Sequence, residues 1–188
     1  MSSHAYIAHL EVLLADAEEL DNAHVRLRTG QRGRQWGLGA INRAVVVLCV
    51  SAWEAYLEAL LNEAIEAMRP SGTALGAWPA LKAQALSDIG RFNNPNVENA
   101  TKLFSSTIGL ADVTSTWGWR NCTHQEARAW LNDALRHRHH IAHGVNPRPT
   151  IRNEYSGWLP GFFRNLGRCT DRAVQSHLVD NLGIVGPW

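Results

Sequence analysis

The sequence predicts an all-α protein, an antiparallel bundle of helices with additional short helices. Apolar residues recur every three or four positions over several long stretches, which is the spacing of helix faces that pack together. No alternating run of apolar and polar residues is long enough to indicate a sheet. The 188 residues are 45% apolar and 19% charged, and no linker rich in Gly, Ser or Pro divides them, so the chain can bury one core. We therefore expect a single domain over residues 1–188, with its core at about 4–144 and a C-terminal helix at about 159–182.

The first expected helix runs from about His4 to Arg28. Its apolar face recurs at alternating steps of four and three residues and comprises Tyr6, Leu10, Leu13, Ala17, Leu20, His24 and Leu27. Several glycines then interrupt the pattern between residues 30 and 39, together with Arg32 and Arg34. This composition predicts a positively charged loop.

A central helix is expected from about Ile41 to Arg69, where apolar positions are densest and Pro-Ser-Gly supplies a stop at residues 70–72. Polar residues also recur along it at steps of three or four, and they form one stripe that comprises Ser51, Glu54, Glu58 and Asn62. A polar stripe on an otherwise apolar helix either faces water or lines a site.

Two shorter helices are expected at about 78–89 and 97–108, joined by a turn rich in Asn and Pro. A capping-box pattern, Thr123-His-Gln-Glu126, then begins a helix that ends at Gly144. After Pro147 and Pro149 the chain is expected to be irregular. A final helix follows at about 159–182, although Gly161 and Gly167 weaken its pattern.

Composition and termini argue against several classes of protein. The net charge of +1 is too small to attract nucleic acid by itself. Three scattered cysteines lack the C-x-x-C spacing of zinc or redox sites, which fits a reducing compartment. The longest apolar run, Ala44 to Val50, is shorter than the roughly 20 residues that cross a bilayer, and the N-terminus lacks the pattern of a secretory signal. We therefore expect a cytoplasmic protein without a membrane span.

Charge is nevertheless concentrated locally. Between Arg136 and Arg152 there are four arginines and four histidines but no Asp or Glu. Such a segment is a candidate binding surface for phosphates, because arginine is always charged and histidine can take up a proton. A basic face that merely contacts water is the alternative.

Charged and titratable residues are densest in the last two turns of the capped helix. This cluster comprises Arg136, His137, Arg138, His139, His140 and His143. His139 and His143 are four residues apart, about 40° round the helix, so both can address one ligand. Arg138 lies about 140° round from His143, so only its long side chain, or a second subunit, brings a guanidinium close. His137 and His140 point elsewhere and are expected at the surface.

Two kinds of chemistry fit this group. A His pair at this spacing can hold zinc. However, the general-base Glu of H-E-x-x-H is absent, and Arg136 and Arg138 would repel a divalent cation. The pattern therefore favours metal-free RNA cleavage, in which histidines act as base and acid while Arg138 stabilises the negative charge that gathers at phosphorus. This chemistry requires no metal and no cofactor.

At this point the residues resemble a known family. Arg138-His-His-Ile-Ala-His143-Gly is similar to the R-x-x-x-x-H motif of HEPN domains. Other segments resemble the RiboL-PSP-HEPN branch, namely Ser51-Ala-Trp-Glu-Ala-Tyr-Leu-Glu58, Asn94-Pro-Asn-Val-Glu-Asn99, Leu103-Phe104 and Trp117. The resemblance spans about 41–144.

The resemblance implies a HEPN-type helical bundle that forms a homodimer, in which two R-x-x-x-x-H motifs make one composite active site that cuts RNA without metal. It implies Arg138 and His143 as catalytic residues, His139 as their polar neighbour, and Glu54 as a supporting residue. A salt bridge from Glu54 to a core-facing arginine is the alternative role for this carboxylate, and it too would place Glu54 beside Arg138. The residues expected to contact RNA are Arg136, His140 and Ser51.

The resemblance also bears on biology. Many HEPN proteins act as toxins or in phage defence, so the expected partners are an RNA substrate and an antitoxin or regulatory protein. His143 is followed by Gly144-Val145, without the tyrosine that marks HEPN toxins paired with nucleotidyltransferase antitoxins, so that partner is not assigned. Other HEPN domains only bind RNA or a protein, and this is the alternative function.

Two tryptophans, Trp117 and Trp119, flank a glycine in an expected loop. Aromatic side chains in such positions can stack with RNA bases. Docking against the bundle is the alternative that we favour for both.

Overall fold

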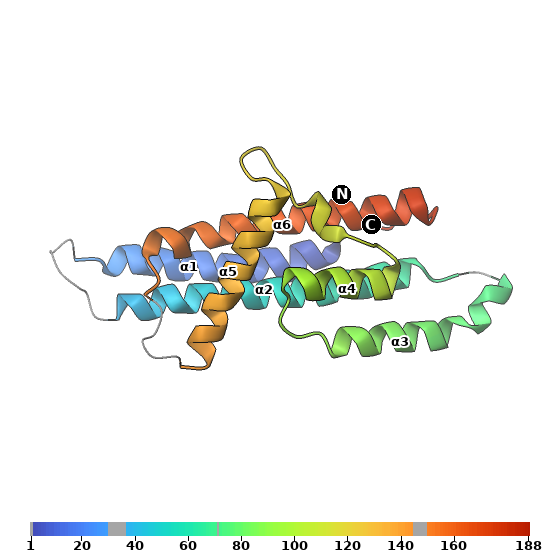
Figure 1. Cartoon of the computed structure of the whole chain (residues 1–188), viewed down its shortest axis with the longest axis horizontal. Helices are drawn as coiled ribbons and strands as arrows, with labels where there is room; N and C mark the ends of the chain where they lie inside the picture. Colours follow the sequence, from blue (N-terminus) through green and yellow to red (C-terminus); the bar gives the residue numbers. More distant parts are fainter. Residues whose placement is uncertain (1, 30–36, 71, 145–149) are drawn as a thin grey trace.

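The computed structural model describes residues 2–29, 37–70, 72–144 and 150–188. Within these ranges the chain forms six α-helices and no β-strand, so the all-α prediction is confirmed (Figure 1). The helices are α1 (Val12–Leu27), α2 (Leu38–Ala67), α3 (Trp78–Gly90), α4 (Val97–Ile108), α5 (His124–Ala142) and α6 (Asn153–Ser176). Short helical segments accompany them, namely η1 (Tyr6–Glu11), η2 (Gly72–Gly76), η3 (Val113–Thr116) and η4 (His177–Asn181).

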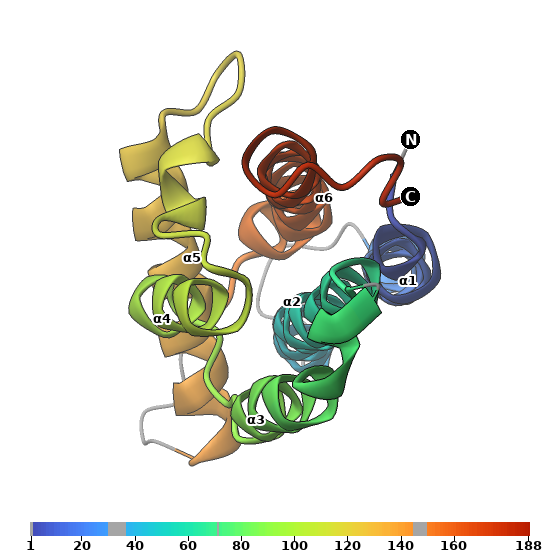
Figure 2. The same ribbon diagram turned by 90° about the vertical axis from the view of Figure 1, so that its right-hand side faces the viewer.

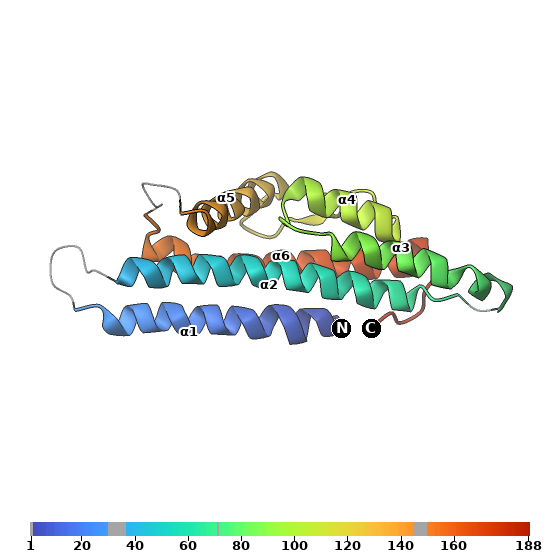
Figure 3. The same ribbon diagram turned by 90° about the horizontal axis from the view of Figure 1, so that it is seen from below.

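The longest helices set the shape of the molecule. Helices α1, α2 and α6 run along its long axis and pack against one another, and α1 is antiparallel to the other two (Figures 1 and 3). Helices α4 and α5 lie on the opposite side of α2 and α6 from α1 (Figure 2). Helix α5 crosses over α2 at a steep angle (Figure 1), so its C-terminal end is not enclosed by the long helices.

Helix α2 is the centre of the hydrophobic core. Trp53 on α2 is fully buried, and its ring packs against those of Tyr56, Trp117 and Phe163. The Trp53 indole N–H donates to the Pro95 carbonyl at 3.2 Å, which satisfies a polar atom that burial removes from water. The core therefore fixes the segment before α4 as well as the long helices.

One described helix, α2, is long and apolar enough to cross a membrane by length and composition. The core helix of a helical bundle passes the same test, and 56% of the apolar window of α2 is buried inside this bundle. The density of apolar residues in α2 is explained by its contacts with the helices around it.

Most predicted boundaries are confirmed. The first helical stretch runs from His4 through η1 and α1 to Leu27, α4 has the predicted bounds, and the capping box at Thr123 is formed. On the expected face of this stretch Leu13 is only partly buried, whereas its neighbour Leu14 is fully buried, and Leu27 is 60% exposed. The charged loop expected after Arg28 lies largely outside the described residues, as does the segment of Pro147 and Pro149.

The predicted start of the last helix is wrong. Helix α6 begins at Asn153, whereas the sequence pattern placed the start at about 159. Tertiary hydrogen bonds hold this first turn in place: the Asn42 amide donates to the Ile151 carbonyl at 2.9 Å, and the Asn153 amide donates to Asp21 at 3.0 Å. These contacts offset the weak helix preference of the glycines that follow.

Candidate active site

Helix α5 carries the candidate site, and its start is fixed by a complete capping box. The Thr123 hydroxyl oxygen accepts from the Glu126 N–H at 3.3 Å, and the Glu126 carboxylate accepts from the Thr123 N–H at 2.8 Å. The side chains that bury one face of α5 in the core are Ala127, Leu131, Ala134 and Leu135. The last helical residue is Ala142, His143 is the C-cap, and Gly144 follows with φ +60°, a left-handed conformation that favours glycine.

Asp133 joins the middle of α5 to α6. Its carboxylate forms an ion pair with Arg136, lies 3.5 Å from His137 Nε2, and accepts from the Tyr155 hydroxyl at 3.1 Å. The rings of His137 and Tyr155 also pack edge to face, with centroids 5.2 Å apart. Burial lowers the pKa of His137 more than the Asp133 carboxylate raises it. His137 therefore has a packing role. The sequence predicted it at the surface, but in the structure it is half-buried.

The next turn of α5 is arranged differently. The imidazoles of His139 and His143 are exposed, and their ring centroids lie 4.3 Å apart. His140 is half-buried, with its ring centroid 6.1 Å from that of His139. Arg138 is half-buried as well. None of these four side chains forms a hydrogen bond or ion pair with a described residue.

The structure brings His139 and His143 together, but it does not join Arg138 to either by a contact within the described part of the chain. Arg136, an expected RNA contact, is exposed and already paired with Asp133. The separation of Arg138 from His143 agrees with their positions about 140° apart around the helix.

Ser51 and Glu54 are half-buried on α2, the helix that α5 crosses. Neither side chain makes a hydrogen bond or ion pair with a described residue, so the salt bridge considered for Glu54 is not formed there. Burial, with the Glu54 charge as a second cause, raises the pKa of Glu58. The polar stripe of α2 therefore lies at the edge of the core, where its acids interact with one another.

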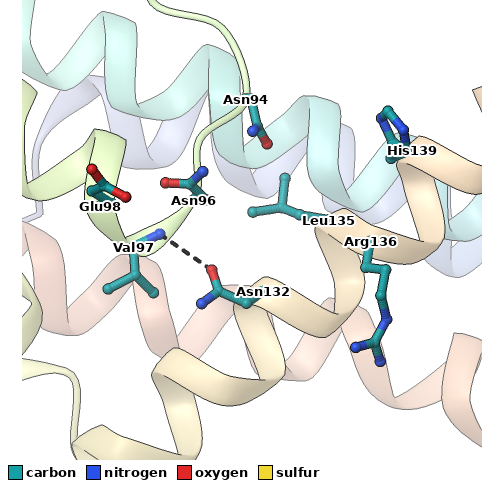
Figure 4. A pocket seen from close by; sticks show the side chains of 8 residues that line it. All are labelled: Asn94, Asn96, Val97, Glu98, Asn132, Leu135, Arg136 and His139. Atoms are coloured by element: carbon teal, nitrogen blue, oxygen red, sulfur yellow. Dashed lines mark hydrogen bonds between the residues drawn. The ribbon is translucent and has the colours of Figure 1, made fainter.

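A pocket of about 520 Å³ opens beside His139 (Figure 4). Asn94, Asn96 and Val97 line it from the segment that leads into α4, and α5 contributes Asn132, Leu135, Arg136 and His139. The Val97 N–H donates to the Asn132 side-chain oxygen at 3.4 Å across its floor. This pocket is not apparent from the sequence, because its two walls lie more than 30 residues apart in the chain. The cluster of asparagines at 93–96 is the one sequence feature that could have indicated a polar site there.

No three His, Cys, Asp or Glu side chains of the described residues gather in a way that could hold a metal ion. The two tryptophans considered for base stacking dock against the bundle. Trp117 is fully buried and its indole donates to Thr170 at 2.9 Å, and Trp119 packs against Phe162.

A helical bundle whose crossing helix ends in R-x-x-x-x-H has the features of the HEPN superfamily. The chain belongs to the RiboL-PSP-HEPN family, whose model matches residues 11–176. The match covers more of the chain than the segments that first indicated the resemblance, and it includes all of α6. Neither the curated proteins nor the solved structures compared with the chain include a significant match.

Proposed function

We propose that the protein is a metal-independent endoribonuclease whose active site lies at the C-terminal end of α5. The observation that carries this proposal is the exposed pair of imidazoles, His139 and His143, with ring centroids 4.3 Å apart and Arg138 next to them in the sequence. None of the three side chains forms an ion pair with a described residue. An acid, a base and a permanent cation free at one helix end fit cleavage of a phosphodiester.

The reaction needs no component beyond RNA. One imidazole takes the proton from a ribose 2′-hydroxyl, and the 2′-oxygen attacks the adjacent phosphorus. The bond from phosphorus to the 5′-oxygen breaks, and a second, protonated imidazole protonates this leaving oxygen. The products are a 2′,3′-cyclic phosphate and a 5′-hydroxyl. In this proposal His143 performs acid–base catalysis, His139 assists it, and the Arg138 guanidinium stabilises the extra charge at phosphorus.

The proposed active form is a homodimer. Arg138 and His143 of one chain are five residues apart, about 140° round α5, and a second copy would bring its own Arg138 to the His143 of the first. Glu54 is the proposed supporting residue for Arg138, since it is half-buried on the helix that α5 crosses. Arg136, His140 and Ser51 are the proposed RNA contacts around this cleft. We place the protein in the cytoplasm as a toxin or phage-defence effector, under control of an antitoxin or regulatory protein.

Incubation with total RNA in excess chelator tests this proposal. Wild type is expected to produce fragments that end in 2′,3′-cyclic phosphate. Arg138→Ala and His143→Ala are each expected to cleave about 10²–10⁴-fold more slowly. Arg26→Ala and His9→Ala are matched controls, because both residues are exposed on the first helical stretch, across the bundle from α5.

If wild type and the two α5 variants release the same fragments, the active site is elsewhere. If wild type binds RNA or a protein but releases no fragments, the protein is a non-catalytic binding module and the enzyme proposal fails.

A further inference from the structure

We propose that the pocket between the α4 entry segment and α5 binds a nucleobase of the RNA, next to the cleaved phosphodiester, and selects bases whose edge carries carbonyl oxygens. This inference rests on the proposed function, because it assigns a subsite to that same active site. The pocket volume of about 520 Å³ lies within the range of small-molecule sites.

The wall of the pocket that precedes α4 is rigid. Asn94 has φ +56°, a backbone conformation that Asn and Gly tolerate better than other residues. Its carbonyl accepts from the Asn99 amide at 2.9 Å, and the next residue, Pro95, is buried and bonded through its carbonyl to Trp53. A strained residue held in place by its surroundings is typical of a binding site. The backbone of this wall is therefore held in place before a ligand binds.

The free polar groups of the pocket are mainly donors. The Asn96 side-chain oxygen caps α4 by accepting from the Asn99 N–H at 2.8 Å, and the Asn132 oxygen accepts from the Val97 N–H. The amide NH₂ groups of both side chains make no hydrogen bond with a described residue, and neither does the whole side chain of Asn94. Free NH₂ groups at fixed positions match carbonyl oxygens on the edge of uracil or guanine.

The remaining lining fits a base better than a phosphate. Val97 and Leu135 give the pocket apolar walls that suit the flat faces of a base. The arginine of the pocket, Arg136, is already paired with Asp133, and the carboxylate of the pocket, Glu98, is paired with Lys102, so the pocket offers no unpaired arginine or lysine to a phosphate. The phosphate is therefore expected outside the pocket, at the cationic helix end.

His139 connects the pocket with the proposed catalytic group. Its imidazole lines the pocket, and the same ring lies 4.3 Å from that of His143, one helical turn further on. A base held against His139 would place its own backbone at His143. The pocket is thus in position to choose which phosphodiester is cut.

Binding of non-cleavable RNA tests the inference independently of catalysis. We suggest fluorescence anisotropy with 2′-O-methyl octamers of uridine and of cytidine. Uracil presents a carbonyl oxygen, O4, where cytosine presents an amino group, and its N3 is a donor where that of cytosine is an acceptor. Wild type is expected to bind the uridine octamer about tenfold more tightly. Equal binding of the two octamers by wild type would overturn the inference.

The informative variants are Asn94→Asp and Asn132→Asp, which keep the shape and the acceptor oxygen but replace the free NH₂ with an acceptor. Each is expected to lose the preference for uridine, whereas Asn22→Asp, the same change at an exposed position of α1, is expected to retain it. Asn94→Gly supplies a second test of the wall, since glycine accepts the positive φ while the side chain is removed. Retained preference in all three pocket variants would contradict the proposed subsite.

The two proposals can fail separately. A preference for uridine that depends on Asn94 and Asn132, without fragments from total RNA, would support the base pocket and reject the nuclease. Fragments that depend on Arg138 and His143, with no base preference, would support the nuclease and reject the pocket.

Discussion

Asp171 is a buried carboxylate on α6 that fastens the N-terminal segment to the bundle. It accepts from the Ser3 N–H at 3.1 Å and from the Ser3 hydroxyl. Burial raises the pKa of Asp171 above its ordinary value, although the bonds from Ser3 oppose the shift. A raised pKa in the folded state means that Asp171 favours folding most when protonated, and that this contribution is lost as the pH rises from about 4 through the folded pKa.

Asp171→Asn and Asp171→Ala separate the charge of this residue from its hydrogen bonds. The alanine variant leaves both Ser3 donors without their acceptor, and it is expected to lower the free energy of unfolding at pH 7 by about 1–3 kcal/mol. The asparagine variant keeps an acceptor without the charge, so it is expected to cost less. Urea unfolding between pH 4 and pH 7 should show wild type losing stability relative to the asparagine variant as the pH rises. A difference that stays constant over this range would contradict the assignment.

Two glycines of α6, Gly157 and Gly167, lie where this helix contacts the first helical stretch. A Cβ at Gly157 would lie 2.8 Å from an Asp21 carboxylate oxygen, and a Cβ at Gly167 would lie 2.2 Å from a Leu10 methyl carbon and 3.1 Å from the Tyr6 ring. The absence of a side chain lets α6 approach η1 and α1 closely. A residue that weakens a helix in isolation thus supports its packing here.

Two substitutions on α6 test this interpretation. Gly167→Ala is expected to lower the free energy of unfolding by about 1–3 kcal/mol, because the added methyl overlaps Leu10 in a well-packed core. Gly161→Ala has nothing within 4 Å of its added Cβ, so it is expected to raise the free energy of unfolding by about 0.5–1 kcal/mol through helix preference alone. Thermal denaturation of both variants gives the comparison. Equal effects at the two sites would show that close approach is not the reason for Gly167.

The same elements explain what sequence could predict. Local signals define α4 and α5, because Asn96 and Thr123 cap their own helices through bonds three residues away. The start of α6 could not be predicted, because long-range hydrogen bonds from Asn42 and Asn153 stabilise it. Gly157 also interrupts the helical pattern of apolar residues there.

Only part of the candidate site can be predicted from the sequence. The pairing of His139 with His143 follows from a spacing of four residues on one helix. The pocket beside them could not be predicted, because it forms only when the segment at Asn94 docks against α5.

The positions of Arg138 and His143 around α5 suggest that the active form contains more than one chain. The two residues are five apart, about 140° round α5, and no contact joins them in the described chain. Helix α5 lies on the side of the bundle away from α1 (Figure 2), and His139 and His143 near its end are exposed. A site that needs both groups at one phosphate is therefore expected to combine two chains.

Mixing inactive variants tests this composite site. Arg138→Ala retains its imidazole and His143→Ala retains its guanidinium, so a mixed dimer contains one intact pair across the interface. Co-expression of the two variants is expected to restore cleavage that neither shows alone. Light scattering should give twice the chain mass of 20.9 kDa for each preparation.

Arg138→Ala mixed with the double variant Arg138→Ala/His143→Ala is the control, since that dimer holds no Arg138 and should stay inactive. Two outcomes would reject the proposed cleft between two copies: a monomeric mass, or a mixture as inactive as this control. Each chain would then have to supply both Arg138 and His143 by itself.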